Sequence, residues 1–180
     1  MTKKGLLVFR KNGVEIAAYS HRDSHLRGLG RKVVRLCRYF SVDELNKLFD
    51  GIILVNDNDE MSSEQIIAYK KYLPEENWNE NLDWCSVLKY CRDITAPLKY
   101  GLLYMVNYIS FRGSLRCRWI YTIDLDKNLL EICKFGLEVI GQESDIIDRS
   151  QIYPSEQEPV IVGSFPLNAI PENWIELCEP

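Results

Sequence analysis

Residues 116–133 read RCRWIYTIDLDKNLLEIC, two apolar runs on either side of a short polar turn. Residues 129–133 form the second run, and the polar residues 126–128 tolerate turn geometry. The first run has the period-two pattern of a strand with one face in a core. The stretch is therefore predicted to form the central hairpin of a sheet. The large apolar residues at alternate positions are Cys117, Trp119, Tyr121 and Ile123.

A second hairpin is predicted over residues 5–19, where Asn12-Gly13 separates two apolar runs. An amphipathic helix with a basic stripe is expected over residues 31–40. Further elements are expected from capping boxes, apolar runs and helical spacing. They are helices over 41–49, 62–73, 82–92 and 173–177, strands over 52–55 and 159–165, and either a strand or a short buried helix over 102–109.

This order of elements predicts an α+β fold, in which the hairpins 5–19 and 116–133 build an antiparallel sheet and the helices pack on it. Residues 1–180 are expected to form a single globular domain, with a long irregular loop at about 136–159.

The composition favours a cytoplasmic protein. The chain has 180 residues, of which 46% are hydrophobic and 27% charged, enough for a core without metal or disulfide support. A net charge of -4 argues against nucleic-acid binding unless a local patch provides it. No apolar run has the length of a bilayer span and no N-terminal run is typical of a secretory signal, so no membrane partner is expected.

The six cysteines show neither a CxxC pair nor a Cys/His metal spacing. Reduced, mostly buried thiols are the favoured interpretation. Cys117 and Cys133 lie on adjacent arms of the central hairpin, so a cross-strand bridge between them is the less favoured alternative.

Four segments occur in an order and spacing that resemble those of a known family over nearly the whole chain. They are KKGL at 3–6, YSHRDSHLRGLG at 19–30, SLRCRWIYTIDLD at 114–126 and SFPLNAIP at 164–171. The resemblance is to a widespread family of uncharacterised proteins of phages, bacteria and fungi, which has no established activity. It implies a phage or host-defence accessory role.

The chain departs from that family's pattern at four positions. His25 stands where the family has Tyr, Leu26 and Arg27 stand where it has Pro-Ser, and Arg118 stands where it has Glu. If these positions carry chemistry in the family, this chain has altered it.

The segment 19–38 is the best candidate for a binding surface. Gly28-Leu29-Gly30 at the start of the basic helix would present free backbone N–H groups to an anion, with arginines adding charge. The alternative is that the glycines only form a tight turn. The expected contact residues are His21, Asp23, Ser24, Arg27, Gly28, Gly30, Arg31 and Arg35.

Two patterns in the sequence resemble metal sites, and neither is expected to bind a metal ion. His21, Asp23 and His25 would face one side of an extended segment, but a polar surface loop is favoured. Residues 124–128 match the first half of a calcium loop, yet residue 135 is Phe where the loop needs Glu. These acidic side chains are expected to hydrogen-bond their own turn. No cofactor is expected.

The function predicted from these observations is a binding or accessory module that contacts a phosphate-bearing ligand or an acidic partner through residues 19–38. The alternative is an enzyme instead of a binding module, namely a hydrolase with an N-terminal nucleophile. Thr2 would become the first residue after removal of Met1, ahead of a strand-turn-strand.

Overall fold

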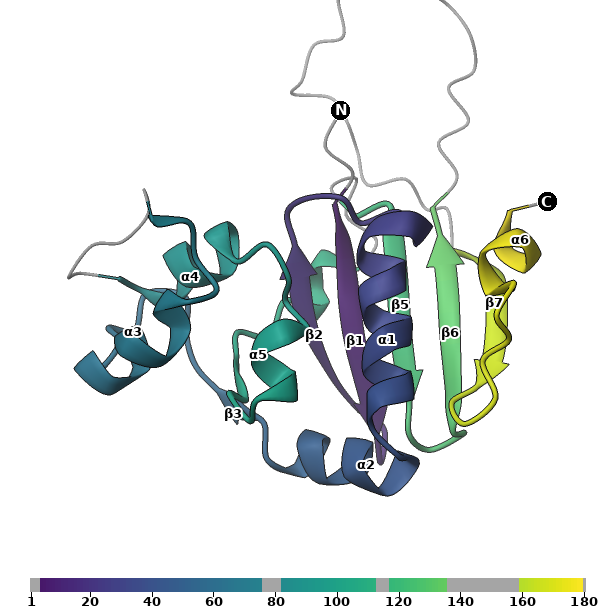
Figure 1. The fold of residues 1–180 in the computed structure, drawn as a ribbon, viewed down its shortest axis with the longest axis horizontal. Coiled ribbons are helices and arrows are strands. Elements are labelled where there is room, and N and C mark those ends of the chain that lie inside the picture. The colour runs from purple at the N-terminus through teal and green to yellow at the C-terminus, as the bar shows by residue number, and fades with distance from the viewer. Residues whose placement is uncertain (1–3, 76–81, 113–116, 136–158, 180) are drawn as a thin grey trace, which may run out of the picture.

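The computed structural model of the protein describes residues 4–75, 82–112, 117–135 and 159–179. Within these ranges five strands form one mixed sheet with helices packed around it, which confirms the α+β class (Figure 1). The sheet strands are β1 (Gly5–Lys11), β2 (Val14–Ser20), β5 (Trp119–Asp124), β6 (Leu129–Lys134) and β7 (Val160–Pro166). The helices are α1 (Arg31–Tyr39), α2 (Val42–Asp50), α3 (Ser63–Lys70), α4 (Trp84–Tyr90), α5 (Ala96–Lys99) and α6 (Trp174–Cys178). The shorter helical turns used below are the π-helical turn η1 (Leu26–Gly30) and the 3-10 turn η3 (Ile109–Phe111).

The sheet order is β2-β1-β5-β6-β7. Both predicted hairpins are confirmed, and β7 adds antiparallel to β6. β1 and β5 run parallel, with Gly5 opposite Trp119 and Arg10 opposite Asp124. This pair departs from the predicted antiparallel sheet. A long crossover through the helices links the two hairpins, and such a crossover is what lets two strands pair in the same direction.

The two hairpin turns lie side by side and are bonded to each other. Asn12 and Gly13 have φ of 51° and 74°, which is the left-handed geometry that their residue types predict. Asp126, in the turn between β5 and β6, accepts hydrogen bonds from the backbone N–H of Asn12 at 2.7 Å and of Gly13 at 3.3 Å. The register of both hairpins is thus fixed at the same end of the sheet.

Helix α1 covers one face of the sheet (Figure 1). Its apolar positions pack against the alternate residues of β1 and β5 that face it, including Phe9 and Tyr121. Helix α2 follows after the predicted capping box, in which the Ser41 hydroxyl accepts from the N–H of Glu44 and the Glu44 carboxylate accepts from the N–H of Ser41. The buried residues of α1 are Val33, Val34, Leu36 and Cys37.

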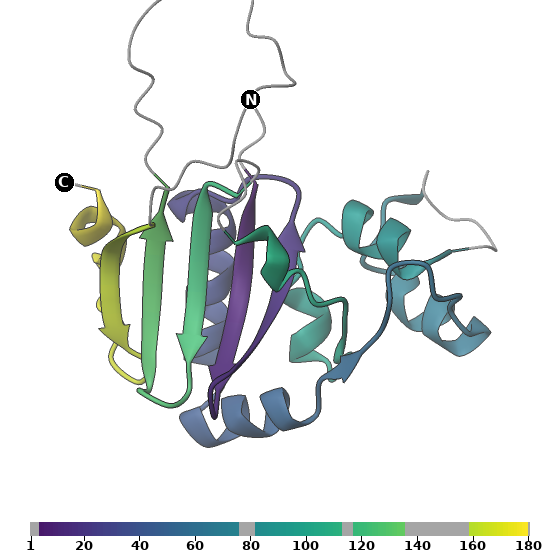
Figure 2. The same ribbon diagram turned by 180° about the vertical axis from the view of Figure 1, so that it is seen from behind.

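Figure 2 shows the opposite face of the sheet. Its side chains form an apolar part and a charged part. The apolar part includes Leu6, Val8 and Ile120, and the segment around η3 packs against it. In the charged part, Arg10 contacts Glu15 at 2.7 Å, Asp124 at 2.7 Å and Glu131 at 3.3 Å. Arg112 adds a second contact to Glu15 at 2.6 Å. The hairpin end of the sheet therefore carries a closed network of ion pairs.

Residues 53–105 include a smaller unit beside β2, and one predicted strand is corrected there. The run 52–55 is a strand only at β3 (Ile53–Leu54), which pairs with β4 (Tyr104–Met105) outside the main sheet. For the segment 102–109, where strand and short helix were both left open, the structure has strand β4 and, only from Ile109 on, the 3-10 turn η3. Short apolar runs fit several structures, and here tertiary contacts decide. The helices predicted over 62–73 and 82–92 are confirmed as α3 and α4.

Ile120, not Cys117, stands opposite Cys133, and the less favoured cross-strand bridge does not form. None of the helices in the described ranges is long and apolar enough to cross a membrane. Most of the loop predicted at about 136–159 lies outside the described residues.

Candidate functional site

The segment between β2 and α1 does not have the extended conformation that a metal site would need. Asp23 has φ of 49°, and the His21 ring contacts Tyr19 edge-on at 4.4 Å between centroids. His21, Asp23 and His25 therefore do not alternate along one face. No cluster of three or more His, Cys, Asp or Glu side chains that could hold a metal occurs in the part of the chain that the structure describes.

The backbone N–H groups predicted to bind an anion are already bonded within the segment. Gly28 donates to the carbonyl of His25 at 3.0 Å, Leu29 to that of Asp23 at 2.7 Å, and Gly30 to that of His25 at 3.2 Å. Arg31 donates to carbonyls of η1. The helical structure begins before the glycines rather than after them, so the helix start offers no free donors at Gly28, Leu29 or Gly30.

Both glycines lie in close packing. A Cβ at Gly28 would clash with the backbone carbonyl of Asp23, and one at Gly30 would lie 3.0 Å from the rings of Trp174 and Tyr121, which would have to shift. Ser24 is fully buried, and its carbonyl accepts a hydrogen bond from the Tyr121 hydroxyl at 2.8 Å. These residues hold η1 against β5 and α6, and this fixes where the neighbouring side chains point.

This packing forms a cleft at the end of the sheet opposite the two hairpin turns. Its volume is about 580 Å³, within the range of small-molecule sites. η1, the start of β5, the end of β6 and the end of α6 form its walls, and Figure 1 shows α6 and the first turn of α1 at this end of the sheet. The lining residues are His25, Leu26, Arg27, Arg118, Trp119, Lys134, Cys178 and Glu179.

The cleft carries an excess of positive charge. Arg27 contacts Glu179 at 3.3 Å, so one cation and the one carboxylate of the lining offset each other. Arg118 and Lys134 form no ion pair within the described residues. The Lys134 ammonium lies 5.5 Å from the centre of the Trp119 ring, to which it is attracted electrostatically.

Two neighbouring hydrogen-bond donors in this lining are buried and unsatisfied. The Nε–H of Arg118 and the Nε1–H of Trp119 have no acceptor within the described residues, and Trp119 is only 6% exposed. A buried donor left without a partner costs about 1–3 kcal/mol. Four buried side-chain N or O atoms of the described part are in this state, and two of them belong to consecutive residues of this lining. The site therefore has hydrogen-bonding capacity that the described residues do not use.

The fold places some of the predicted contact residues in the cleft and others outside it. His25 and Arg27 line the cleft, whereas Arg31 and Arg35 lie exposed along α1 and do not line it. Asp23 is exposed, and Ser24 is buried under β5. Thr2, the nucleophile of the alternative prediction, lies outside the described residues.

Sequence reasoning missed the strand residues of the site, Arg118, Trp119 and Lys134. One signal pointed to Arg118, because it is a departure from the pattern that the sequence resembles. All four departures named above, at positions 25, 26, 27 and 118, line this one cleft. Their proximity follows from strand pairing between distant segments, which local sequence signals do not reveal.

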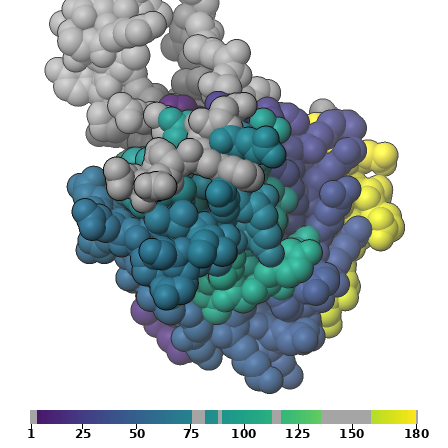
Figure 3. Space-filling model, turned by 60° about the vertical axis from the view of Figure 1, so that its left-hand side comes forward, coloured from purple at the N-terminus to yellow at the C-terminus, as the bar shows by residue number. Residues whose placement is uncertain are grey.

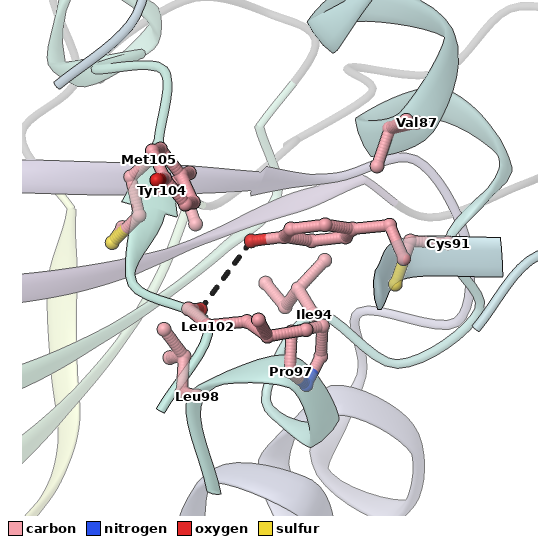
Figure 4. Close-up of a pocket in the computed structure, with 10 residues that line it drawn as sticks. Val87, Cys91, Ile94, Pro97, Leu98, Leu102, Tyr104 and Met105 are labelled. Carbon is pink, nitrogen blue, oxygen red and sulfur yellow. Dashed lines mark hydrogen bonds between the residues drawn. The ribbon is translucent and has the colours of Figure 1, made fainter. Parts of the chain in front are cut away.

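A second cavity lies between the sheet and the smaller unit, and it is of a different kind (Figure 4). Its volume is about 20 Å³, room for about one water molecule, and its lining is almost entirely apolar. The Tyr69 hydroxyl donates to the carbonyl of Leu102 at 3.4 Å, and burial raises the pKa of Cys91 to about 11. This cavity is a packing void and offers no group to orient a ligand.

The turn after β5 uses Asp124 as predicted, whereas Asp126 bonds the Asn12-Gly13 turn of the other hairpin instead of its own turn. The Asp124 carboxylate accepts from the backbone N–H of Asp126 at 3.1 Å and of Lys127 at 3.0 Å. These bonds hold the turn, so they account for the D-x-D pattern without a cation.

Comparison of the chain with protein-family models, with curated proteins and with solved structures gave no match. The resemblance described above therefore stays a prediction.

Proposed function

We propose that this protein is a binding module that takes a small phosphate-bearing ligand in the cleft between η1, β5, β6 and α6. The observation that carries the proposal is the set of cations in the described lining, Arg27, Arg118 and Lys134. Arg118 and Trp119 of the same lining each keep a buried donor without a partner in the described residues. Native structures satisfy nearly all of their buried polar groups, so these two donors need an acceptor that the described residues do not supply.

The charges of the described lining favour an anion as that acceptor. Among the described residues, three cations, Arg27, Arg118 and Lys134, stand against one carboxylate, that of Glu179. A guanidinium binds phosphate oxygens through two parallel N–H bonds, and an ammonium adds a point charge with adjustable donors. A phosphate group thus uses both the geometry of Arg118 and the charge of Lys134.

The other groups of the cleft add selectivity. The Arg27–Glu179 contact is exposed on both sides, at 58% and 51%, so it contributes at most about 1 kcal/mol and opens at little cost. Once it opens, Arg27 turns to the anion, and Glu179 becomes an acceptor for a hydroxyl or amino group. The ligand that fits best carries such a group beside its phosphate.

Calorimetric titration with pyrophosphate at low ionic strength tests the proposal. The wild type is expected to bind, and Arg118→Gln and Lys134→Gln are each expected to lose about 10- to 100-fold in affinity, because each removes a charge-assisted hydrogen bond. Lys47→Gln is the matched control, since Lys47 is an exposed cation on α2 far from the cleft lining.

Binding that is absent in the wild type would refute the proposal. Equal losses in Arg118→Gln and Lys47→Gln would refute the assignment of the site, because general charge attraction would then explain the affinity.

A further inference from the structure

A second surface of the molecule combines exposed tyrosine rings with cations. It lies where the end of α1, the end of α5 and the residues after α3 meet, and Figure 3 shows α5 at the surface between α1 and α3. Tyr39 is 62% exposed and Tyr100 is 70% exposed. Exposed rings of this kind are available for stacking with a partner's aromatic groups.

A lysine is held close to each of these rings. The Lys99 ammonium lies 5.7 Å from the centre of the Tyr39 ring. The Lys71 ammonium lies 4.8 Å from the centre of the Tyr100 ring and 5.0 Å from that of Tyr72. Rings and cations therefore alternate along the surface in the order Tyr39, Lys99, Tyr100, Lys71, Tyr72, which we call the tyrosine-lysine track.

Helix α1 extends the track with two more cations. Arg31, Arg35 and Tyr39 are all exposed and follow one another at helical spacing of four residues, so they share one face of α1. This adds about 12 Å to the track at 1.5 Å per residue. Neither these two arginines nor the two lysines form an ion pair within the residues that the structure describes.

We infer that the tyrosine-lysine track, with Arg31 and Arg35, binds single-stranded nucleic acid. Proteins that bind single strands combine cations along the backbone with aromatic rings on which bases stack, and both features are present here in alternation. A double helix keeps its bases stacked inside and offers the rings nothing to contact. An acidic protein segment would use the cations but would leave the exposed rings without a role.

The net charge of -4 does not contradict this inference, because it averages over the whole chain whereas binding depends on the local surface. The track shares no residue with the lining of the phosphate cleft. Each of the two proposals can therefore be refuted without affecting the other.

Fluorescence anisotropy with a short labelled oligothymidine at low salt tests the inference. The wild type is expected to bind, with affinity that falls as salt rises. Tyr39→Ala combined with Tyr100→Ala is expected to lose at least about tenfold in affinity, because two stacking platforms are removed. Lys71→Gln combined with Lys99→Gln is expected to reduce the slope of log affinity against log salt by about 1.4, since each phosphate contact on a single strand contributes about 0.7.

Two controls keep the result specific. Tyr39→Phe retains the ring and is expected to bind like the wild type. Lys47→Gln removes an exposed cation outside the track and is expected to leave both affinity and slope unchanged. Circular dichroism of each variant confirms that it is folded.

The inference is overturned if the wild type does not bind, or if the double alanine variant binds as tightly as the wild type. It is also overturned if polyglutamate competes as well as unlabelled oligothymidine. In that case the surface takes acidic polymers of any kind and the rings have no part in recognition.

Discussion

Two arginines at opposite ends of the same sheet have opposite surroundings. Arg10, at the hairpin end, contacts three carboxylates. Arg118, at the other end, forms no ion pair within the described residues and keeps a buried Nε–H without an acceptor. The first arrangement is complete by itself and supports the fold. The arrangement around Arg118 leaves a donor unsatisfied in the described residues, which is expected of a ligand-binding site without its ligand.

The largest effect is expected from Arg10→Met. This change leaves Glu15, Asp124 and Glu131 crowded together without their shared cation, and Asp124 is fully buried. Removing one partner from a buried ion pair costs about 3–5 kcal/mol. Urea unfolding is expected to show a loss of about that size, with pyrophosphate binding retained in the folded protein. A loss under about 1 kcal/mol would show that the network does little for stability.

The second prediction concerns the stability of the protein at acidic pH. Burial by itself raises the pKa of Asp124, but hydrogen bonds from Arg10 and from the Lys127 backbone, with the charge of Arg10, outweigh it and lower the pKa below its ordinary value. The pKa of Glu15 is lowered in the same way, with burial again opposing the hydrogen bonds from Arg10 and Arg112.

Because these pKa values are lower in the folded state, the network stabilises the protein above the ordinary carboxyl pKa of about 4. That contribution is lost as the pH falls through the folded-state pKa values. The free energy of unfolding of the wild type is therefore expected to fall from about pH 5 downward. Asp124→Asn is expected to flatten this slope while lowering stability at neutral pH. An unchanged slope in Asp124→Asn would show that other carboxylates cause the acid sensitivity.

The smallest effect on stability is expected from Arg118→Met. This change removes no ion pair of the described residues and takes away a buried unsatisfied donor. The free energy of unfolding is expected to stay within about 0.5 kcal/mol of the wild type, or to rise. A loss as large as that of Arg10→Met would mean that Arg118 has a structural partner, and the contrast between the two ends of the sheet would fail.

Features set by neighbours in sequence were predictable, and features set by distant pairing were not. The Asn12-Gly13 turn and the capping boxes at Ser41 and Ser62 form as expected, because each depends on residues a few positions apart. The parallel pairing of β1 with β5 depends on a long crossover, and the sequence carries no local signal for it.

The cleft follows the same rule. His25 and Arg27 were recognised within one segment, but strand pairing brings Lys134 opposite Trp119 and places both beside η1. The glycines are an exception among the local features. The N–H groups of Gly28 and Gly30 both donate to the carbonyl of His25, the N-cap of a π-helical turn that residue patterns did not indicate.

The most direct test of the central claim is the indole N–H signal of Trp119 in a nitrogen-proton correlation spectrum, assigned by its loss in Trp119→Phe. Of the four tryptophans in the chain, Trp119 lines the cleft and has a buried Nε1–H without an acceptor in the described residues. Addition of pyrophosphate is predicted to shift this signal downfield with saturation, as the donor gains an acceptor, while the other indole signals stay in place. A Trp119 signal that does not move at saturating pyrophosphate would contradict the account.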